Sequence, residues 1–399
     1  MNNIRIPRHQ YLDRLIELRD KPIIKAIVGI RRCGKSTLLE IYRDHLISEG
    51  VDKGNIILMN FTHSPFSGMN DKDVIREVKK TDGRKYILLD EVQMLQSWDK
   101  MVLDMFENID CDICITGSNS VMFSSKLSTP LSGRAVSIEM FPFSYREFLS
   151  YTREDDTDDS LMEYMTYGGF PIALMVRSSK DAEMAVLEDI YSTVILKDIV
   201  QRNSIRNQGM LDRISRFMMR NIGNFVSVKS IMDYMISSGS KVNFETVDNY
   251  MGYLEESLAF YRVKRYNIKV KEELVVNDKF YLSDPGIRTA VLGRRDADIG
   301  HVMENLVFLE LKRRGYTVYV GKLDDFEVDF VANDHTRTLY VQVCYSLRDP
   351  VTEEREIRPL RSINDDHRKI IITMEQSLNR DREGIAEIGI REFLMGYRV

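Results

Sequence analysis

Short apolar runs alternate with stretches of helical spacing over the first 145 residues of the chain. The apolar runs cover residues 25–28, 86–89, 112–116 and 135–140. Continuous apolar runs of this length are typical of strands buried on both faces, as in parallel sheets covered by helices. The pattern therefore predicts an α/β domain with three layers, in which a parallel sheet lies between two layers of helices.

The rest of the chain changes from helices to a mixture of helices and strands. Residues 146–207 are dense in Met, Leu, Tyr and Glu at helical spacing, which predicts a small group of helices. Farther on, we expect helices at 210–222, 228–237, 244–258 and 300–314, and strands at 260–266, 279–282, 317–320, 327–331 and 339–343. These patterns predict four regions: 1–145, 146–207, 208–292 and 293–399.

Composition is that of an ordinary folded protein. The 399 residues are enough for two or three domains, each with its own core. Hydrophobic residues make up 43% of the chain and charged residues 29%, which argues against extensive disorder. Because the formal net charge is −5, the molecule as a whole does not attract nucleic acid, and DNA binding would require a local basic surface.

The cysteines and the apolar segments exclude two classes of protein. Four cysteines, at 33, 111, 114 and 344, are too few and too scattered for a disulfide framework, and we expect the Cys111–Cys114 pair to pack in the core. No signal peptide is evident, and no apolar run approaches the roughly 20 residues that span a bilayer. We therefore expect a cytoplasmic protein without a membrane partner.

A phosphate-binding loop follows the first predicted strand. The loop reads G-x-x-x-x-G-K-[ST] and comprises Gly29, Ile30, Arg31, Arg32, Cys33, Gly34, Lys35, Ser36 and Thr37. In this strand–loop–helix context the backbone N–H groups and the helix N-terminus bind phosphates, the lysine reaches the β- and γ-phosphates, and the serine hydroxyl coordinates Mg²⁺. The motif predicts ATP as ligand and Mg²⁺ as cofactor, with Lys35 and Ser36 in these roles.

A carboxylate pair ends the strand at 86–89. Asp90 and Glu91 follow four apolar residues, as expected for the second half of a P-loop site. We expect Asp90 to hold Mg²⁺ through water. Glu91 is then the general base that polarises the attacking water.

Two further polar residues are candidates for the same site. Asn119 follows the strand at 112–116 and is our candidate sensor of the γ-phosphate, with Ser118 next; a plain helix N-cap is the alternative. Arg134 precedes the strand at 135–140. It is a candidate arginine finger, acting either in cis or across a subunit interface.

With these residues identified, the chain resembles a prokaryotic family of AAA-type (AAA+) P-loop ATPases. The matching segments are Gly-Ile-Arg-Arg-Cys-Gly-Lys-Ser-Thr (29–37), Leu-Asp-Glu-Val-Gln (89–93), Thr-Gly-Ser-Asn-Ser (116–120), Leu-Ser-Gly-Arg (131–134), Pro-Phe-Ser-Tyr-Arg-Glu-Phe (142–148), Gly-Gly-Phe-Pro (168–171) and Leu-Lys-Asp-Ile (196–199). The resemblance implies an AAA+ core at 1–145, a helical lid at 146–207, a winged helix at 208–292 and a domain related to restriction endonucleases at 293–399. It also implies ATP and Mg²⁺. Because AAA-type proteins often form rings, a homo-oligomer or a protein partner is a further expectation.

The winged-helix region raises the question of DNA binding. Its expected recognition helix carries Asp248, Glu255 and Glu256, whose carboxylates repel phosphates. Cations instead follow this helix, at Arg262, Lys264, Arg265, Lys269 and Lys271, and precede it, at Arg202, Arg206, Arg213, Arg216 and Arg220. Double-stranded DNA therefore remains a candidate partner, without a specific motif that selects it.

The last region has the spacing of an endonuclease-like site but lacks two of its residues. Asp329 lies on one predicted strand, whereas Gln342 and Cys344 stand where a second carboxylate and a lysine are required for metal-assisted hydrolysis. We expect an endonuclease-like fold with lost or impaired nuclease activity, and Glu304, Glu327 and Asp329 as remnants or surface charges.

Three functions are therefore open. The first is an ATPase whose cycle drives or gates movement of its C-terminal domains. The second is an ATP-gated switch or DNA-binding module with little turnover, and the third is a nuclease regulated by ATP. Because a hydrolase needs a water-orienting group, Glu91 favours the first.

Overall fold

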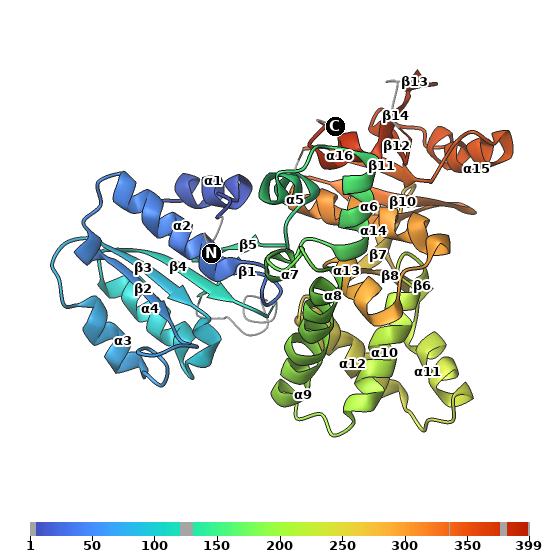
Figure 1. Ribbon diagram of the computed structural model, residues 1–399. Helices are drawn as coiled ribbons and strands as arrows, with labels where there is room; N and C mark the ends of the chain where they lie inside the picture. The colour runs from blue at the N-terminus through green and yellow to red at the C-terminus, as the bar shows by residue number, and fades with distance from the viewer. Residues whose placement is uncertain (1–4, 120–130, 335, 376–380, 398–399) are drawn as a thin grey trace. The chain divides into compact units, whose positions relative to one another are not determined.

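The computed structural model describes residues 5–119, 131–334, 336–375 and 381–397. The chain divides into two compact units: residues 1–142 with the short segment 256–258, and residues 143–255 with 259–399. Each unit is built on its own β-sheet (Figure 1). The first unit ends at Pro142, three residues before the expected boundary at 145.

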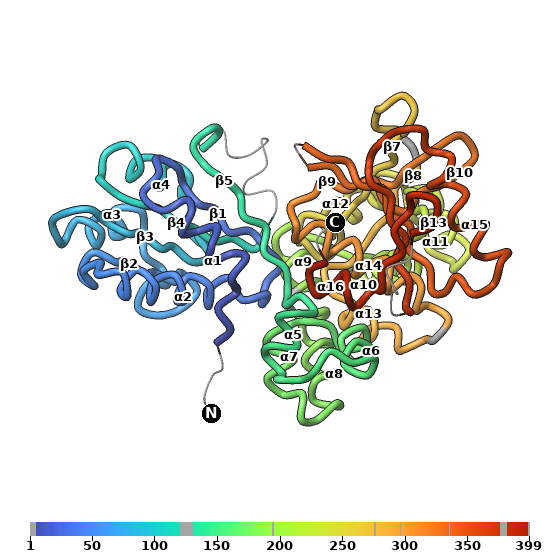
Figure 2. The backbone as a smooth tube through the Cα atoms, turned by 90° about the horizontal axis from the view of Figure 1, so that it is seen from above, coloured from blue at the N-terminus to red at the C-terminus, as the bar shows by residue number. Residues whose placement is uncertain are grey.

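The first unit holds a five-stranded parallel sheet in the order β2-β3-β4-β1-β5, which can be followed in Figure 1 and, from above, in Figure 2. The strands are β1 (Ile24–Val28), β2 (Ile56–Asn60), β3 (Lys85–Asp90), β4 (Cys111–Gly117) and β5 (Ala135–Glu139). The helices are α1 (His9–Glu17), α2 (Lys35–Ser48), α3 (Asp71–Val78) and α4 (Trp98–Asn108), with short 3-10 turns at Lys53–Asn55 and Val92–Met94.

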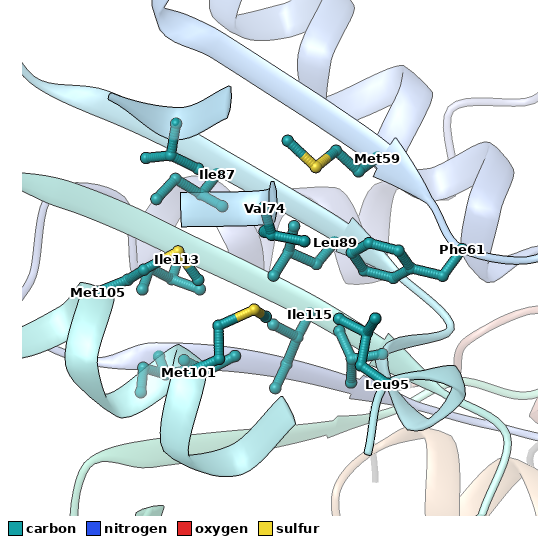
Figure 3. Packing of buried hydrophobic residues seen from close by; sticks show 14 of the residues in the cluster. Met59, Phe61, Val74, Ile87, Leu89, Leu95, Met101, Met105, Ile113 and Ile115 are labelled. Atoms are coloured by element: carbon teal, nitrogen blue, oxygen red, sulfur yellow. The ribbon is translucent and has the colours of Figure 1, made fainter. Parts of the chain in front are cut away.

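Helices cover both faces of this sheet (Figure 1). Ile87 and Leu89 of β3 pack with Val74 of α3 and Met101 of α4 in one buried cluster (Figure 3). Because successive strand residues point to opposite faces, Leu88 points to the other face, which α2 covers. The predicted three-layer α/β core is therefore confirmed.

One strand of this sheet is absent from the sequence interpretation. β2 lies at the sheet edge and pairs in parallel with β3, so that Asn60 stands beside Asp90. β2 begins with four apolar residues, without the alternation of apolar and polar positions that marks a strand with one exposed face. Most of its side chains are half-buried. Its position brings Asn60 to the end of the strand that carries the acidic pair.

The second unit is α/β with a nine-stranded mixed sheet in the order β13-β14-β12-β11-β10-β9-β7-β8-β6. Its strands are β6 (Phe225–Val226), β7 (Phe260–Asn267), β8 (Glu272–Leu282), β9 (Thr317–Leu323), β10 (Phe326–Asn333), β11 (Thr338–Val343), β12 (Arg368–Thr373), β13 (Asp381–Arg382) and β14 (Ile385–Gly389). Its helices are α5 (Tyr145–Thr152), α6 (Asp158–Tyr167), α7 (Pro171–Leu174), α8 (Lys180–Asp189), a π-helical turn η5 (Ile190–Lys197), α9 (Asp198–Arg202), α10 (Gln208–Arg220), α11 (Val228–Ser237), α12 (Phe244–Glu256), α13 (Pro285–Leu292), α14 (Ile299–Arg313), α15 (Pro350–Arg361) and α16 (Ile390–Leu394), with a 3-10 turn η6 at Asp296–Asp298.

The boundaries expected at 207 and 292 do not separate compact units. α5 to α8 form a group (Figure 2), and α6 and α8 of this group pack against α13. β7 pairs in parallel with β9, with Arg265 opposite Val320, so the regions before and after residue 292 share one sheet. These contacts between distant segments join residues 143–207, 208–292 and 293–399 into one body.

A buried carboxylate fastens the group of helices to α13. Asp284 accepts hydrogen bonds from the backbone N–H of Gly169 at 2.7 Å and of Gly286 at 2.8 Å. Gly168 has a φ of 73°, and a Cβ atom there would lie 1.8 Å from Oδ1 of Asp284. The turn after α6 therefore needs glycine at position 168 for its conformation and for this close approach. Burial raises the pKa of Asp284 to about 7.

Candidate functional site

The phosphate-binding loop leaves the carboxyl end of β1 and begins α2. A Cβ atom at Gly29 would lie 2.2 Å from the carbonyl oxygen of Met140, so no larger residue fits there. Gly34 has a φ of 107° and stands at the N-cap of α2. The two motif glycines therefore have separate tasks: the first permits close packing against the chain after β5, and the second permits the turn into the helix.

Lys35 lies inside the loop. Its side chain is buried, and Nζ donates to the carbonyl oxygens of Gly29 at 2.8 Å and Ile30 at 3.2 Å. The same Nζ lies 3.7 Å from Oε1 of Glu91. The structure thus brings the lysine of the loop and the second residue of the acidic pair to the same edge of the sheet.

The other residues of the loop differ in exposure. Arg31, Arg32, Ser36 and Thr37 are exposed, whereas Ile30 and Cys33 are buried. The Cys33 thiol donates to the carbonyl oxygen of Met140 at 3.5 Å, and burial raises its pKa. Cys33 therefore helps to pack the loop and is not a nucleophile in this environment.

Asp90 is the centre of a buried hydrogen-bond network. Its Oδ1 accepts from the Thr116 hydroxyl at 2.6 Å, and its Oδ2 accepts from the side-chain amide of Asn60. The Ser36 hydroxyl also hydrogen-bonds to the Asp90 carboxylate. Burial has the largest effect on this carboxylate and raises the pKa of Asp90. These donors orient the carboxylate toward the start of α2.

The oxygen atoms of Ser36 and Asp90 fit a magnesium ion. Mg²⁺ takes oxygen ligands and is usually bound by one or two carboxylates together with substrate phosphates, rather than by a cage of protein ligands. The described part of the chain has no cluster of three or more His, Cys, Asp or Glu side chains that could hold a metal.

Glu91 is held in an uncommon backbone conformation. Its φ is 57°, in the left-handed region that non-glycine residues rarely adopt, and its N–H donates to the hydroxyl of Thr116 at 2.9 Å. One carboxylate oxygen accepts from the side chain of Gln93, which also donates to the Ser118 hydroxyl at 3.2 Å. Backbone strain of this kind is maintained by surrounding contacts and is frequent at functional sites.

Asn119 lies at the same edge of the sheet as the loop. β4 ends at Gly117, which pairs with Val28 at the end of β1, and Asn119 follows two residues later with a largely buried side chain. The role of Asn119 as a sensor of the γ-phosphate stays a prediction. The alternative of an N-cap depends on residues 120–130, which lie outside the described residues.

Arg134 lies at the opposite edge. It directly precedes β5, and Ala135 pairs with Ile24 at the start of β1, so the full length of β1, roughly 16 Å, separates it from the loop. Its guanidinium lies 3.3 Å from Glu107 near the end of α4. Because an arginine side chain spans less than this separation, the placement of Arg134 disfavours a finger acting in cis. The role of Arg134 stays a prediction.

Sequence interpretation missed three residues around the site. Asn60 and Thr116 orient Asp90, and Arg8 donates to the carbonyl oxygen of Cys33 at 3.0 Å. Thr116 was available as a polar residue that ends an apolar strand. Asn60 and Arg8 carry no motif signal, because only strand order and chain tracing bring them to the loop.

The cysteine pair of β4 has the expected environment. Cys114 is fully buried, Cys111 is half-buried, and both are free thiols. Burial raises the pKa of Cys111 to about 11. The pair packs in the core.

A second group of charges lies in the second unit. Nζ of Lys279 on β8 lies 2.7 Å from Glu327 and 2.9 Å from Glu304, and 3.9 Å from Asp329. Gln342 accepts from the N–H of Asp329 at 3.3 Å and donates to Glu356 at 2.8 Å. The acids interpreted as remnants or surface charges thus surround a buried ammonium group, which sequence spacing did not predict because Lys279 is 50 residues before Asp329.

The cations of the hairpin β7–β8 are largely paired with acids. Arg262 pairs with Glu255 at 2.5 Å, Lys264 with Glu273 at 2.7 Å, and Lys269 with Asp324 at 2.6 Å. On α10, by contrast, Arg213 donates to the hydroxyl of Ser240 and Arg220 to that of Tyr234. The charge available to phosphates on the hairpin is therefore smaller than the sequence suggested.

Family models and known proteins match long parts of the chain. Residues 21–149 match an AAA domain, and residues 158–298 match a domain of unknown function. An uncharacterized protein of Haemophilus influenzae is 34% identical over 404 residues, covering 99% of this chain and 100% of that protein. An uncharacterized protein of Methanocaldococcus jannaschii is 27% identical over 380 residues, covering 90% of this chain and 83% of that protein. In the described residues no helix is long and apolar enough to cross a membrane.

Solved structures are similar to this chain at lower sequence identity. The ORC1 protein of Aeropyrum pernix in complex with DNA has a TM-score of 0.32 and 14% identity, covering 72% of this chain and 92% of that chain. AMPPCP-bound DnaA from Aquifex aeolicus has a TM-score of 0.33 and 11% identity, covering 63% and 89%. The matched AAA domain and the full-length Haemophilus relative show that the chain belongs to a family of AAA-type P-loop ATPases.

Proposed function

We propose that this chain binds ATP with Mg²⁺ at the edge formed by Gly29–Thr37 and Asp90–Glu91, hydrolyses it, and uses the cycle to drive or gate movement of its second unit. The observation that carries the proposal is the position of Glu91. Its carboxylate lies 3.7 Å from the ammonium group of Lys35, and its strained backbone is held by Thr116. A lysine for the phosphates and a base for the water thus lie in one site.

The chemistry assigned to each residue follows from its surroundings. The N–H groups of the loop and Lys35 bind the phosphates, and Ser36 and Asp90 would hold Mg²⁺, which neutralises phosphate charge when bound. Glu91 takes a proton from water as the water oxygen bonds to the γ-phosphorus and the bond to the ADP oxygen breaks. Asn119 contacts the γ-phosphate. Arg134 contributes to the site of a neighbouring copy.

A switch with little turnover is the second candidate function. The group from α10 through β8 supports it, because the order helix, strand, two helices and hairpin, with β6 antiparallel to β8, is that of a winged helix. Such a module could bind double-stranded DNA when ATP is present. The ion pairs on the hairpin weigh against it, and α10 with Arg213 and Arg220 is then the surface that remains for phosphates.

Nuclease activity has the least support. The endonuclease-like interpretation of residues 293–399 requires carboxylates that are available to a metal, whereas Glu304 and Glu327 contact Lys279. An ammonium group among these acids neutralises the charge that a divalent cation would need.

Steady-state ATP hydrolysis by the purified chain tests the proposal. The wild type, Glu91→Gln and the control Glu49→Gln, at an exposed glutamate after α2, are measured with Mg²⁺, alone and with double-stranded DNA. We expect Glu91→Gln to bind ATP but to hydrolyse it at least about 100-fold more slowly than the wild type, because a general base contributes about 10²–10⁴ in rate. Equal rates for wild type and Glu91→Gln would contradict the proposed base. ATP binding without turnover in all three proteins would favour the switch, and stimulation of turnover by DNA would support a DNA partner.

A further inference from the structure

A buried arginine joins two distant parts of the first unit. Arg8 lies just before α1, and its side chain is almost fully buried. Its Nη1 donates to the carbonyl oxygen of Cys33 in the phosphate-binding loop at 3.0 Å, and its Nη2 donates to that of Phe141 at 2.7 Å. One guanidinium group thus connects the loop to the segment that follows β5.

The local structure around Arg8 is built to hold this side chain. Arg8 has a φ of 48°, and its own carbonyl oxygen accepts the first hydrogen bonds of α1, from Tyr11 and Leu12. The ring of Tyr11 lies 4.9 Å from the guanidinium carbon, in a cation–π contact, and the Tyr11 hydroxyl accepts the N–H of Phe141 at 3.2 Å. The left-handed backbone conformation of Arg8 costs free energy, and such conformations persist only where surrounding contacts maintain them. The contacts of the Arg8 side chain with Tyr11, Cys33 and Phe141 are of this kind.

The segment after β5 packs against the loop at more than one point. The N–H of Met140 donates to the carbonyl oxygen of Val28 at 2.7 Å, and its carbonyl oxygen accepts from the Cys33 thiol. A Cβ atom at residue 29 would lie 2.2 Å from the same carbonyl oxygen, so the loop backbone packs closely against Met140. The phosphate-binding loop and Met140 are therefore joined by close packing and a hydrogen bond in addition to the contacts of Arg8.

The chain enters the second unit immediately after this segment. Phe141 is held in the first unit by Arg8 and Tyr11. In the second unit, the N–H of Phe143 donates to the carbonyl oxygen of Gly169 at 2.8 Å, and its carbonyl oxygen accepts from the Tyr164 hydroxyl at 2.7 Å. Pro142 is the one residue of this connection between the two anchored residues.

We propose that Arg8 is a positioning residue that makes the phosphate-binding loop and residues 140–141 move as one piece, so that nucleotide binding at the loop is passed to the start of the second unit. The inference rests on the proposed function, because it assigns ATP to the loop. Its physical basis is that a buried guanidinium with two charge-assisted hydrogen bonds cannot release one carbonyl group without leaving a buried charge incompletely paired.

The first test measures the loop without nucleotide. The rate of Cys33 alkylation by N-ethylmaleimide, followed by mass spectrometry of the peptide, is compared in wild type, Arg8→Met and Arg5→Met. Arg5 is an exposed arginine of the same segment, paired with Glu40, and serves as the control. Loss of a charged hydrogen bond should raise exposure of the Cys33 thiol, and hence its labelling rate, about tenfold or more in Arg8→Met only. Unchanged labelling in a folded Arg8→Met protein would overturn the proposal.

The second test measures the transmission. Binding of a fluorescent ATP analogue and hydrogen exchange of the Phe141 and Phe143 amides are followed with and without ATP and Mg²⁺. We expect ATP to slow exchange at both amides in wild type and Arg5→Met. Saturating ATP should leave the Phe143 amide unchanged in Arg8→Met, and Arg8→Lys, which keeps the charge but not the two-pronged donor, should be intermediate. The same protection of Phe143 in Arg8→Met as in wild type would also overturn the proposal.

The two failures are distinguishable. If the wild type binds no ATP, the proposed function is wrong, while Cys33 labelling still decides whether Arg8 holds the loop. If Arg8→Met does not fold, as judged by its thermal unfolding, Arg8→Lys carries both measurements. Arg8 would have no positioning role if both variants, Arg8→Lys and Arg8→Met, labelled Cys33 at the wild-type rate and showed the wild-type slowing of Phe143 exchange by ATP.

Discussion

The hydroxyl of Thr116 donates to the carboxylate of Asp90 at 2.6 Å across the β3–β4 pair. The same oxygen atom accepts the N–H of Glu91 at 2.9 Å. One side chain of β4 therefore orients both residues of the acidic pair, the first through its side chain and the second through its backbone. The end of β4 supplies more to the site than the sensor residue expected from the sequence.

Thr116→Val should impair turnover without unfolding the protein, because it keeps the shape of the side chain and removes the hydroxyl. Asp90 loses a donor and the Glu91 N–H loses its acceptor, each worth about 1–3 kcal/mol. We expect ATP hydrolysis to fall about tenfold or more while ATP affinity changes less. Thr116→Ser, which restores the hydroxyl, should recover most of the activity, and equal activity of the valine and serine variants would contradict this role.

If Arg134 is an arginine finger, its distance from its own loop along β1 favours action on another copy of the chain. Mixing Arg134→Ala with Lys35→Ala therefore tests a finger in trans. The first variant retains an intact loop and the second retains the arginine, so a mixed assembly contains one complete site. Hydrolysis above the sum of the two separate proteins supports a homo-oligomer with a shared site. A mixture that is only additive assigns Arg134 to its ion pair with Glu107 at 3.3 Å.

Asp284 should make the second unit less stable as the pH rises. Burial raises its pKa to about 7 in the folded protein, whereas an aspartate in an unfolded chain has a pKa of about 3.9. Between these values the folded state keeps a proton that the unfolded state has lost, so the free energy of unfolding falls as pH rises from about 4 to about 7, by at most about 1.4 kcal/mol per pH unit.

Urea unfolding at pH 5 and pH 7 checks this dependence. Asp284→Asn removes the titrating group and should flatten the difference between the two pH values, whereas Asp159→Asn, an exposed carboxylate on α6, should leave it as in wild type. An unchanged difference in Asp284→Asn would assign the pH dependence to other groups.

Lys279 should be important for stability rather than for nuclease activity. Replacing Lys279 by methionine leaves Glu304 and Glu327 without their buried cation. We expect the free energy of unfolding to fall by about 3–5 kcal/mol, the usual cost of removing one partner of a buried ion pair. Lys264→Met breaks only an exposed pair with Glu273 and should cost about 1 kcal/mol or less. Chemical unfolding of both variants measures the difference.

The same residues provide the test of cleavage. We expect wild-type protein to leave supercoiled plasmid intact with Mg²⁺ or Mn²⁺, with or without ATP. Robust cutting that is abolished by Asp329→Ala would show that the endonuclease-like region is active despite Gln342 and Cys344.

Patterns along the chain alone predict the parallel α/β core, the phosphate-binding loop at 29–37 and the acidic pair at 90–91. These features depend on local patterns: an apolar run specifies a buried strand, and a glycine-rich turn before a helix specifies a phosphate site. The tertiary structure decided which edge of the sheet each residue occupies. It brought Asn60 and Thr116 to Asp90, placed Arg134 at the far edge, and put Lys279 among Glu304, Glu327 and Asp329. Strand order, register and the joining of residues 143–399 into one unit arise from contacts between residues far apart in the chain, which spacing along the sequence does not specify.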